Sequence, residues 1–230
     1  MCEQFSQNGA TPEIRSILSE ANSKYNGFQM DAGDKNPNDI SPVLTISSNN
    51  NIEAKPMAWG IPEIENRKYI YQVESDMALH ERSLRRCLLR YPVAVPVTGF
   101  YEWKKEPLRK KWHKTYFHDS ADAIFYLAGF CRHSDENGEP VDRYTLLRSR
   151  PNKYLMLYHI RMPLLLKKEE VRDWLNGTNI SYYLNRQPFR LKAEPVGTSR
   201  PVSYTHLSPK TLRFTLMPES RAASTLPPSA

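Results

Sequence analysis

The strongest structural signal in the chain is the run PVAVPVTGFYEW at residues 92–103. Its first half alternates valine with alanine or proline, and this two-residue period is typical of a strand. Thr98 and Gly99 then predict a bulge, after which the strand continues to residue 103. In that second half Glu102 shares a face with Phe100, because successive side chains of a strand point to opposite faces. A carboxylate that alternates with aromatic residues on a sheet calls for a structural or functional reason.

Other elements are predicted on both sides of this run. Thr11 and Pro12 are the expected N-cap and first residue of a helix over residues 12–24. The remaining patterns predict helices at 77–89, 152–159 and 167–175, and strands at 43–46, 56–62, 123–131 and 143–148. Hydrophobic residues make up 40% of the 230-residue chain, enough for one sizeable core. We therefore expect one domain over residues 2–199.

Residues 200–230 lack periodicity and end in Ser, Pro and Ala. We expect them to form a tail outside the core, either disordered or foreign to the original gene. The whole chain has a formal net charge of +7 and a pI of about 9.2. Four basic residues and one acidic residue of the tail contribute +3, which leaves +4 on residues 1–199. Positive charge favours a polyanionic partner such as nucleic acid, and the smaller excess on the core weakens this indication.

The three cysteines, Cys2, Cys87 and Cys131, are an odd number without a CxxC spacing. This pattern disfavours a disulfide framework and a structural zinc site, and it fits buried thiols at Cys87 and Cys131. No stretch approaches the ~20 apolar residues of a membrane span, and residues 1–13 lack the pattern of a secretory signal. We expect a protein of the reducing cytoplasm, with no cofactor, no metal and no membrane partner.

Cys2 becomes the N-terminal residue once Met1 is removed, and removal is normal before a small residue. The chain then begins with a 1,2-aminothiol. Because the α-amine has a pKa of ~7.7–8.0 and the thiol one of ~8.5, both nucleophiles are partly available near neutral pH. An aldehyde can form an imine with the amine and then close onto sulfur as a thiazolidine. The alternative is an accidental cysteine on a frayed terminus.

Three motifs follow Cys2 in order: WGIP at residues 59–62, Arg86-Cys87 leading into GFYEW at 99–103, and HIRMP at 159–163. With Met1-Cys2 at the start, this combination resembles the SRAP family, the SOS-response-associated peptidase-like proteins that cross-link to abasic sites. The resemblance covers roughly residues 2–197. It implies a compact single α+β domain, mainly β, with a partly barrel-like sheet and flanking helices.

The resemblance assigns Cys2 to the family's catalytic cysteine, Glu102 to its motif glutamate and His159 to its motif histidine. Glu102 would move protons during sugar ring opening and imine formation. His159, with an ordinary pKa of ~6.5, would assist the same transfers. Taken by themselves, Glu102 also fits a solvated strand position and His159 a residue that caps helix carbonyls.

A DNA-binding groove is implied by the same resemblance. Arg161 matches the family's phosphate-contacting arginine, and Trp59 would stack beside the unpaired strand, where stacking is worth ~1–3 kcal/mol per base. The other DNA-binding candidates are Trp103, Arg85, Arg86 and the basic run at residues 104–114. The alternatives are a structural ion pair for Arg161, core packing for the two tryptophans, and a solvated loop for residues 104–114.

Two stretches depart from the family's pattern. Glu3 and Gln4 stand where the family has Gly-Arg after the cysteine. Gln72 and Glu74 fall at the asparagine and the arginine of the family's Asn-Ala-Arg-x-Glu segment. Gln72 is thus a possible active-site residue, one methylene longer than the usual asparagine. These changes affect the DNA-binding groove more than the expected catalytic set.

The expected function is covalent capture of abasic sites in single-stranded DNA, through a thiazolidine on Cys2 of a monomeric repair or damage-shielding protein. The resemblance also implies autoproteolytic exposure of Cys2, so the expected enzyme class is hydrolase or lyase. Two other classes stay open: a cysteine peptidase acting on protein substrates, and a non-catalytic single-stranded DNA-binding module. The peptidase would stay active with a blocked α-amine, and the module would be indifferent to Cys2→Ala.

Overall fold

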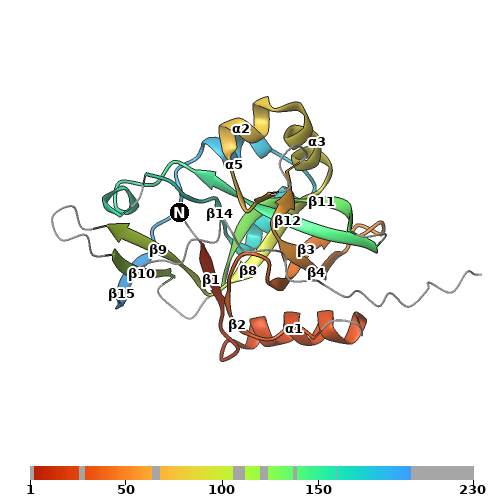
Figure 1. Ribbon diagram of the computed structural model, residues 1–230, viewed down its shortest axis with the longest axis horizontal. Coiled ribbons are helices and arrows are strands. Elements are labelled where there is room, and N and C mark those ends of the chain that lie inside the picture. The colour runs from red at the N-terminus through yellow and green to blue at the C-terminus, as the bar shows by residue number, and fades with distance from the viewer. Residues whose placement is uncertain are drawn as a thin grey trace, which may run out of the picture.

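The computed structural model of the chain (Figure 1) describes residues 3–25, 29–63, 68–105, 112–119, 124–136, 139–158 and 160–197. Cys2, His159, most of the basic run and the expected tail at 200–230 lie outside these segments. Among the described residues, no helix is long and apolar enough to cross a membrane.

Five strands close into a barrel-like sheet. In spatial order they are β8 (Pro92–Val97), β3 (Ile40–Ile46), β4 (Ile52–Trp59), β12 (Glu139–Ser149) and β11 (Phe125–Glu136). The ring closes because β11 pairs with both β12 and β8. The β4–β12 pair is parallel, and the other neighbours are antiparallel. The expected α+β fold, mainly β with a barrel-like sheet, is confirmed.

A second sheet lies beside this ring, and all its neighbouring strands are antiparallel. Its order is β15 (Lys192–Gly197), β10 (Trp112–His118), β9 (Gly99–Lys105), β1 (Gln4–Gln7) and β2 (Gly33–Lys35). The single bulged strand predicted over residues 92–103 is therefore wrong, since β8 and β9 belong to different sheets. The chain turns at Thr98, whose N–H and hydroxyl both donate to the carbonyl of Ser6, at 2.8 and 3.1 Å.

Helices cover the strands from two sides, with α1 on one side and α2, α3 and α5 on the other (Figure 1). The helix predicted over residues 12–24 is confirmed as α1 (Pro12–Lys24). The helix predicted over 77–89 is two helices, α2 (Ser75–His80) and α3 (Arg82–Arg90). They separate at Glu81, because its carboxylate accepts the backbone N–H groups of Ser83 and Leu84 and so begins α3.

The remaining elements are short. The segment predicted as a helix over 152–159 forms only the 3-10 turn η1 (Leu155–Leu157) within its described part. The helix predicted over 167–175 is a 3-10 turn, η2 (Lys168–Glu170), followed by α4 (Val171–Leu175). The others are β5 (Ile61–Pro62), β6 (Tyr69–Ile70), β7 (Gln72–Glu74), β13 (Met162–Pro163), β14 (Leu165–Leu166) and α5 (Ile180–Asn185).

The two faces of the barrel strands enter different hydrophobic clusters. On β8 the alternating valines at 93, 95 and 97 pack in one cluster with three aromatic residues of the second sheet. These aromatic residues are Phe5, Phe100 and Phe117. Ala94 belongs to the other cluster, together with Leu18 of α1 and Trp174 of α4. Phe100 and Glu102, which alternate with Tyr101 and Trp103 on β9, therefore point into the layer between the two sheets.

Gly129 is required where β11 approaches β12. A Cβ atom at this position would lie 2.2 Å from the backbone carbonyl oxygen of Thr145, which cannot move without disturbing the strand pair. We expect Gly129→Ala to lower the free energy of unfolding by about 3 kcal/mol, the upper end of typical overpacking costs. Urea denaturation measures this, with Gly197→Ala as control, since a Cβ there meets no atom within 4 Å. Equal stability of the two variants would contradict this close approach.

Candidate active site

Glu102 lies on β9 and is only 4% exposed. It shares a strand face with Phe100, and antiparallel pairing places it opposite Thr115 of β10, which is also buried. Burial raises the pKa of the Glu102 carboxyl above its ordinary range, while the positive charge of Arg148 acts in the opposite direction. A carboxyl with a raised pKa holds its proton closer to neutral pH and is suited to general acid catalysis.

The N-terminal strand leads toward Glu102. β1 runs antiparallel to β9 with Gln4 opposite Tyr101, so the register carries the residue before Gln4 toward Glu102. That residue, Glu3, is half-buried. Burial raises the pKa of its carboxyl, and the nearby charge of Glu102 raises this pKa further. The residue that adjoins Cys2 in the sequence therefore lies within electrostatic reach of Glu102.

Glu74 bridges two arginines beside this region. Its Oε1 lies 2.7 Å from Nη2 of Arg148, and its Oε2 accepts a 2.7 Å hydrogen bond from Nε of Arg161. The parallel β7–β12 pair sets Glu74 opposite Arg148, and the β12–β13 pair sets Pro163 opposite the same arginine. Arg148 also acts electrostatically on Glu102, so the buried carboxyl lies within electrostatic reach of this ion-pair cluster.

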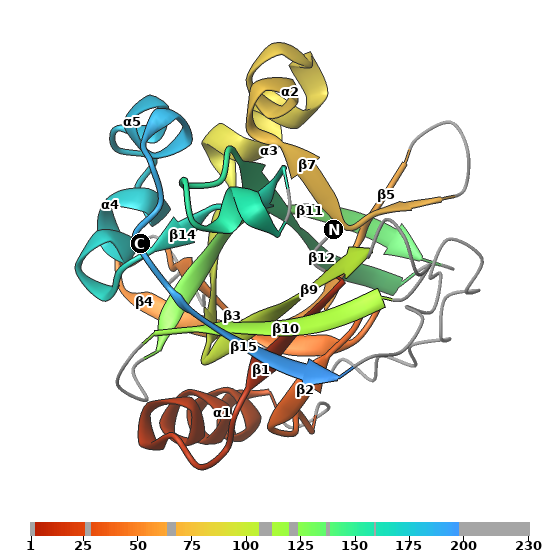
Figure 2. The ribbon, with the colours of Figure 1, turned by 90° about the vertical axis from the view of Figure 1, so that its left-hand side faces the viewer.

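A cavity of about 150 Å³ opens at the ion-pair cluster. In Figure 2, β7 leads into α2 and lies beside β12, with which it pairs. The charged residues that line the cavity are Arg148, Arg150, Arg161, Arg186, Glu74 and Asp76. Basic side chains outnumber acidic ones, so the cavity suits an anion.

Gln72 is partly buried on β7, opposite Leu146 of β12. It lies two residues before Glu74 and therefore shares its strand face. Leu146 packs in the cluster between the two sheets, so this face of β7 is turned toward the layer that Glu102 enters. The structure thus places Gln72 on the side of the candidate site.

The segment that precedes His159 packs on the same layer. Asn152 shapes it: the side-chain carbonyl accepts the N–H groups of Tyr154 and Leu155, and the amide donates to the carbonyl of Phe189 at 3.2 Å. Tyr158 packs edge-on against Phe117, with ring centroids 5.2 Å apart. A cleft of about 660 Å³ separates this segment from residues 190–194. His159 and Cys2 lie outside the described residues, so their placement in the site stays a prediction.

The interpretation of Trp59 as an exposed base platform is wrong. Its ring is completely buried, and the indole N–H donates to the carbonyl oxygen of Tyr71 at 2.8 Å. The ring packs against Phe5, at 5.2 Å between centroids, and edge-on against the Tyr71 ring. Trp59 ends β4, and its side chain packs in the cluster between the two sheets.

We expect Trp59→Phe to reduce stability without changing DNA binding. The substitution removes one of the two donors to the Tyr71 carbonyl, which keeps the N–H of Leu146 at 3.1 Å, and it removes buried ring atoms, at a cost of ~1–3 kcal/mol. Urea denaturation and fluorescence anisotropy with a single-stranded oligonucleotide measure the two quantities. Loss of affinity in a folded Trp59→Phe variant would restore the stacking interpretation.

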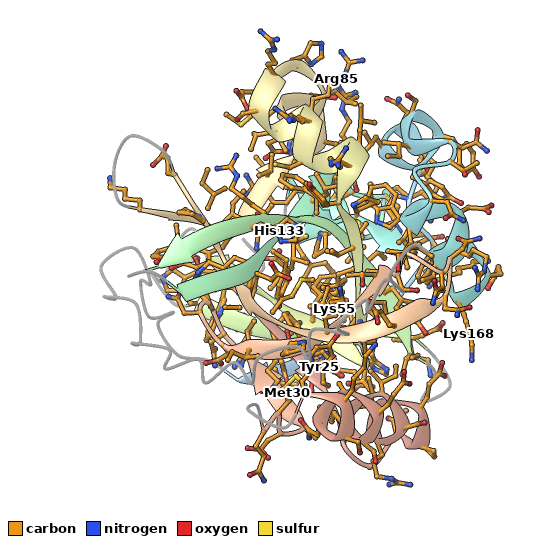
Figure 3. All side chains as sticks on the ribbon, turned by 90° about the vertical axis from the view of Figure 1, so that its right-hand side faces the viewer. Tyr25, Met30, Lys55, Arg85, His133 and Lys168 are labelled. Atoms are coloured by element: carbon orange, nitrogen blue, oxygen red, sulfur yellow. The ribbon has the colours of Figure 1, made fainter. Side chains whose placement is uncertain are left out.

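The other DNA-binding candidates are not gathered at Glu102. Trp103 is half-buried on the opposite face of β9, and Nζ of Lys114 lies 5.7 Å from its ring centroid. Arg85 and Arg86 are exposed on the outside of α3, as Figure 3 shows for Arg85. Neither arginine lines the cavity at the ion-pair cluster. Of the basic run 104–114, residues 106–111 lie outside the described segments.

Three residues of the site had no role in the sequence-based prediction of the catalytic set. Arg148 was only the last residue of a predicted strand, and Glu3 and Glu74 were noted as departures from a family pattern. No local signal connects Glu74 with Arg148, because their contact depends on a parallel strand pair between residues far apart in the chain.

The fold and the site together define a class: a single α+β domain with a buried glutamate beside its N-terminal strand and an arginine-lined cavity. The model of one family, SOS response associated peptidase (SRAP), matches residues 1–201. The chain therefore belongs to the SRAP family.

Named relatives agree with this assignment. The abasic site processing protein YoaM of Bacillus subtilis (strain 168) is 27% identical over 154 residues, which are 62% of this chain and 64% of that protein. YoqW of Bacillus phage SPbeta is 26% identical over 145 residues, covering 61% and 64%. The matches thus span somewhat less than two thirds of these relatives.

Two crystal structures share the fold. A protein from Bordetella bronchiseptica aligns with a TM-score of 0.67 at 20% identity, over 85% of this chain and all of that one. A protein from Bacteroides thetaiotaomicron aligns with a TM-score of 0.64 at 21% identity, over 85% and 92%. At these identities the likeness supports the architecture alone.

Proposed function

We propose that this protein captures abasic sites in single-stranded DNA by forming a covalent bond to Cys2. The observation that carries the proposal is the burial of Glu102 next to the strand that begins two residues after Cys2. A proton donor held in a layer without bulk water suits the ring opening of a sugar. The names of YoaM and YoqW, both abasic site processing proteins, point to the same substrate.

The chemistry balances without a cofactor. Ring opening of the abasic sugar gives an aldehyde, and the α-amine of Cys2 adds to its carbon to form a carbinolamine. Protonation of the carbinolamine hydroxyl by Glu102 releases one water and leaves an iminium, which becomes the imine when its N–H proton returns to the Glu102 carboxylate. The Cys2 sulfur then adds to the imine carbon, its proton passes to nitrogen, and a thiazolidine closes. His159 is the proposed second proton carrier.

The arginine-lined cavity is the proposed anchor for the DNA backbone. Guanidinium groups suit phosphate because their planar donors can bind two oxygens at once. Arg161 is the proposed phosphate contact, with Arg148 beside it and Gln72 on the adjoining strand face. Trp103, Arg85 and Arg86 are proposed only for weaker contacts with the flanking strand, because they lie away from the cavity.

Incubation with an oligonucleotide that contains one abasic site tests the proposal. We expect an adduct that resists denaturing electrophoresis, and no adduct with a tetrahydrofuran analogue that has no aldehyde. Absence of the adduct under conditions where another abasic-site cross-linking protein forms one would overturn the proposal.

The family's peptidase description offers a second candidate function, peptide hydrolysis through the Cys2 thiol. Chemical blocking of the α-amine separates the two, since it stops imine formation and leaves a thiol nucleophile intact.

A further inference from the structure

We propose that Glu74 occupies the phosphate site of this protein as a tethered anion, and that it thereby limits affinity for the DNA strand. The inference deepens the proposed function and rests on it. It assigns to Glu74 the role of an affinity-limiting residue that the strand must displace.

The geometry of Glu74 is that of a bound oxyanion. Its two carboxylate oxygens lie 2.7 Å from two different guanidinium groups, one on Arg148 and one on Arg161. Two oxygens of a phosphodiester present the same pattern of acceptors to a pair of arginines. A strand phosphate and the Glu74 carboxylate therefore compete for the same donors.

The cavity offers donors that Glu74 does not use. Within the described residues, the buried Nε of Arg148 has no hydrogen-bond partner. Arg150 is exposed at the same cavity. A phosphodiester has more acceptor oxygens than a carboxylate, so it can satisfy donors that Glu74 leaves over.

Glu74 strongly affects the net charge around the cavity. Arg186 is committed to Glu170, with Nη2 2.7 Å from Oε2. Among the charged residues that line the cavity, the other three arginines outnumber the two carboxylates, Glu74 and Asp76, by one. Neutralising Glu74 raises this excess to two and so favours an anion.

Displacement of Glu74 is compatible with the fold. The side chains of Glu74, Arg148 and Arg161 are 30%, 20% and 38% exposed, and ion pairs in contact with water contribute little to stability. The opposite role is that Glu74 holds the two arginines in place for the strand. The two roles predict opposite signs for the effect of Glu74→Gln on affinity.

The test is the affinity of the full chain for a single-stranded oligonucleotide with a tetrahydrofuran site, measured by fluorescence anisotropy over a range of salt. We expect Glu74→Gln to bind about tenfold more tightly at low salt. We also expect the slope of log K against log salt to steepen by about 0.7, the value for one additional phosphate contact on a single strand. The double variant Glu74→Gln with Arg161→Gln should lose this gain, because the released arginine is then absent.

Glu53→Gln is the matched control. Glu53 also bridges two basic side chains, Lys24 and Lys55. Lys55 is labelled in Figure 3, which shows the side of the molecule opposite to that in Figure 2. The Glu53→Gln variant loses the same charge as Glu74→Gln, so it reports the effect of net charge alone. We expect its affinity for the oligonucleotide to change by less than about twofold. If Glu74→Gln does not fold, Glu74→Asp takes its place in the test. The shorter side chain cannot reach both arginines, so we expect this variant also to bind the oligonucleotide more tightly than the wild type.

Unchanged or weaker binding of the Glu74 variants would overturn the inference, as would an equal gain in Glu53→Gln. The aldehyde-free oligonucleotide separates this outcome from failure of the proposed function. If wild-type protein cross-links an abasic site but Glu74→Gln gains no affinity, only the inference about Glu74 is wrong. If Glu74→Gln binds more tightly but no variant cross-links, the tethered anion stands and the covalent chemistry is wrong.

Discussion

Replacing Cys2 with serine is expected to reduce the stable adduct with an abasic oligonucleotide to background. The variant keeps the α-amine, so it still forms an imine, but an imine without sulfur to trap it hydrolyses back to the aldehyde. Borohydride should therefore recover a reduced adduct from Cys2→Ser, because it converts the imine into a stable amine. Denaturing electrophoresis with and without borohydride measures both species.

The chain provides its own controls for this experiment. Burial raises the pKa of the Cys131 thiol to about 12, so this cysteine is almost entirely protonated and unreactive at neutral pH. Cys87 is half-buried on α3, and Cys87→Ser should cross-link like the wild type. A stable adduct of Cys2→Ser without borohydride would contradict thiazolidine closure. Loss of the adduct in Cys87→Ser would indicate that Cys87 on α3 takes part in the reaction.

Replacing Glu102 with glutamine is expected to slow adduct formation by ~10²–10⁴-fold, the usual contribution of a positioned acid or base. Glutamine has nearly the same shape as glutamate and still accepts a hydrogen bond, but it cannot release a proton to the sugar oxygen or to the carbinolamine. Single-turnover kinetics with the abasic oligonucleotide measure the rate. A rate within about threefold of the wild type would exclude Glu102 as the proton donor.

The same substitution should stabilise the fold at high pH. Because the pKa of Glu102 is raised in the folded protein, the folded state binds the proton more tightly than the unfolded chain does. Ionisation of Glu102 therefore costs stability increasingly as pH rises from about 4.5, the ordinary value, through the raised pKa. Glu102→Gln removes this cost, so its Tm should exceed that of the wild type at pH 8 and equal it at pH 4. A lower Tm at pH 8 would show that the ionised carboxylate is the stabilised form.

Much of the fold followed from local patterns in the sequence. The helix that begins at Pro12 was predicted to the residue because a proline and an acidic first turn mark its start. The break at Glu81 was not predicted, since capping by its side chain competes with a continuous helical pattern. Thr98 and Gly99 were interpreted as a bulge because strand-like residues stand on both sides of them, and only the contacts with Ser6 show that the chain changes sheets there.

The site was predictable where a motif carries it and not where tertiary contacts build it. Glu102 stood out as a carboxylate among aromatic residues, and its burial agrees with that signal. Trp59 was misassigned because a tryptophan in a motif looks the same whether its ring faces the core or the surface. The Glu74–Arg148–Arg161 cluster needed the register of β12 with β7 and β13, which connects segments far apart in sequence.

The mass of the intact adduct tests the central claim most directly. Covalent capture by Cys2 predicts one species whose mass equals the chain without Met1, plus the abasic oligonucleotide, minus one water. Fragmentation should place the DNA on Cys2 alone. An adduct on a lysine, or one formed by a chain that still carries Met1, would contradict capture by the Cys2 amine and thiol.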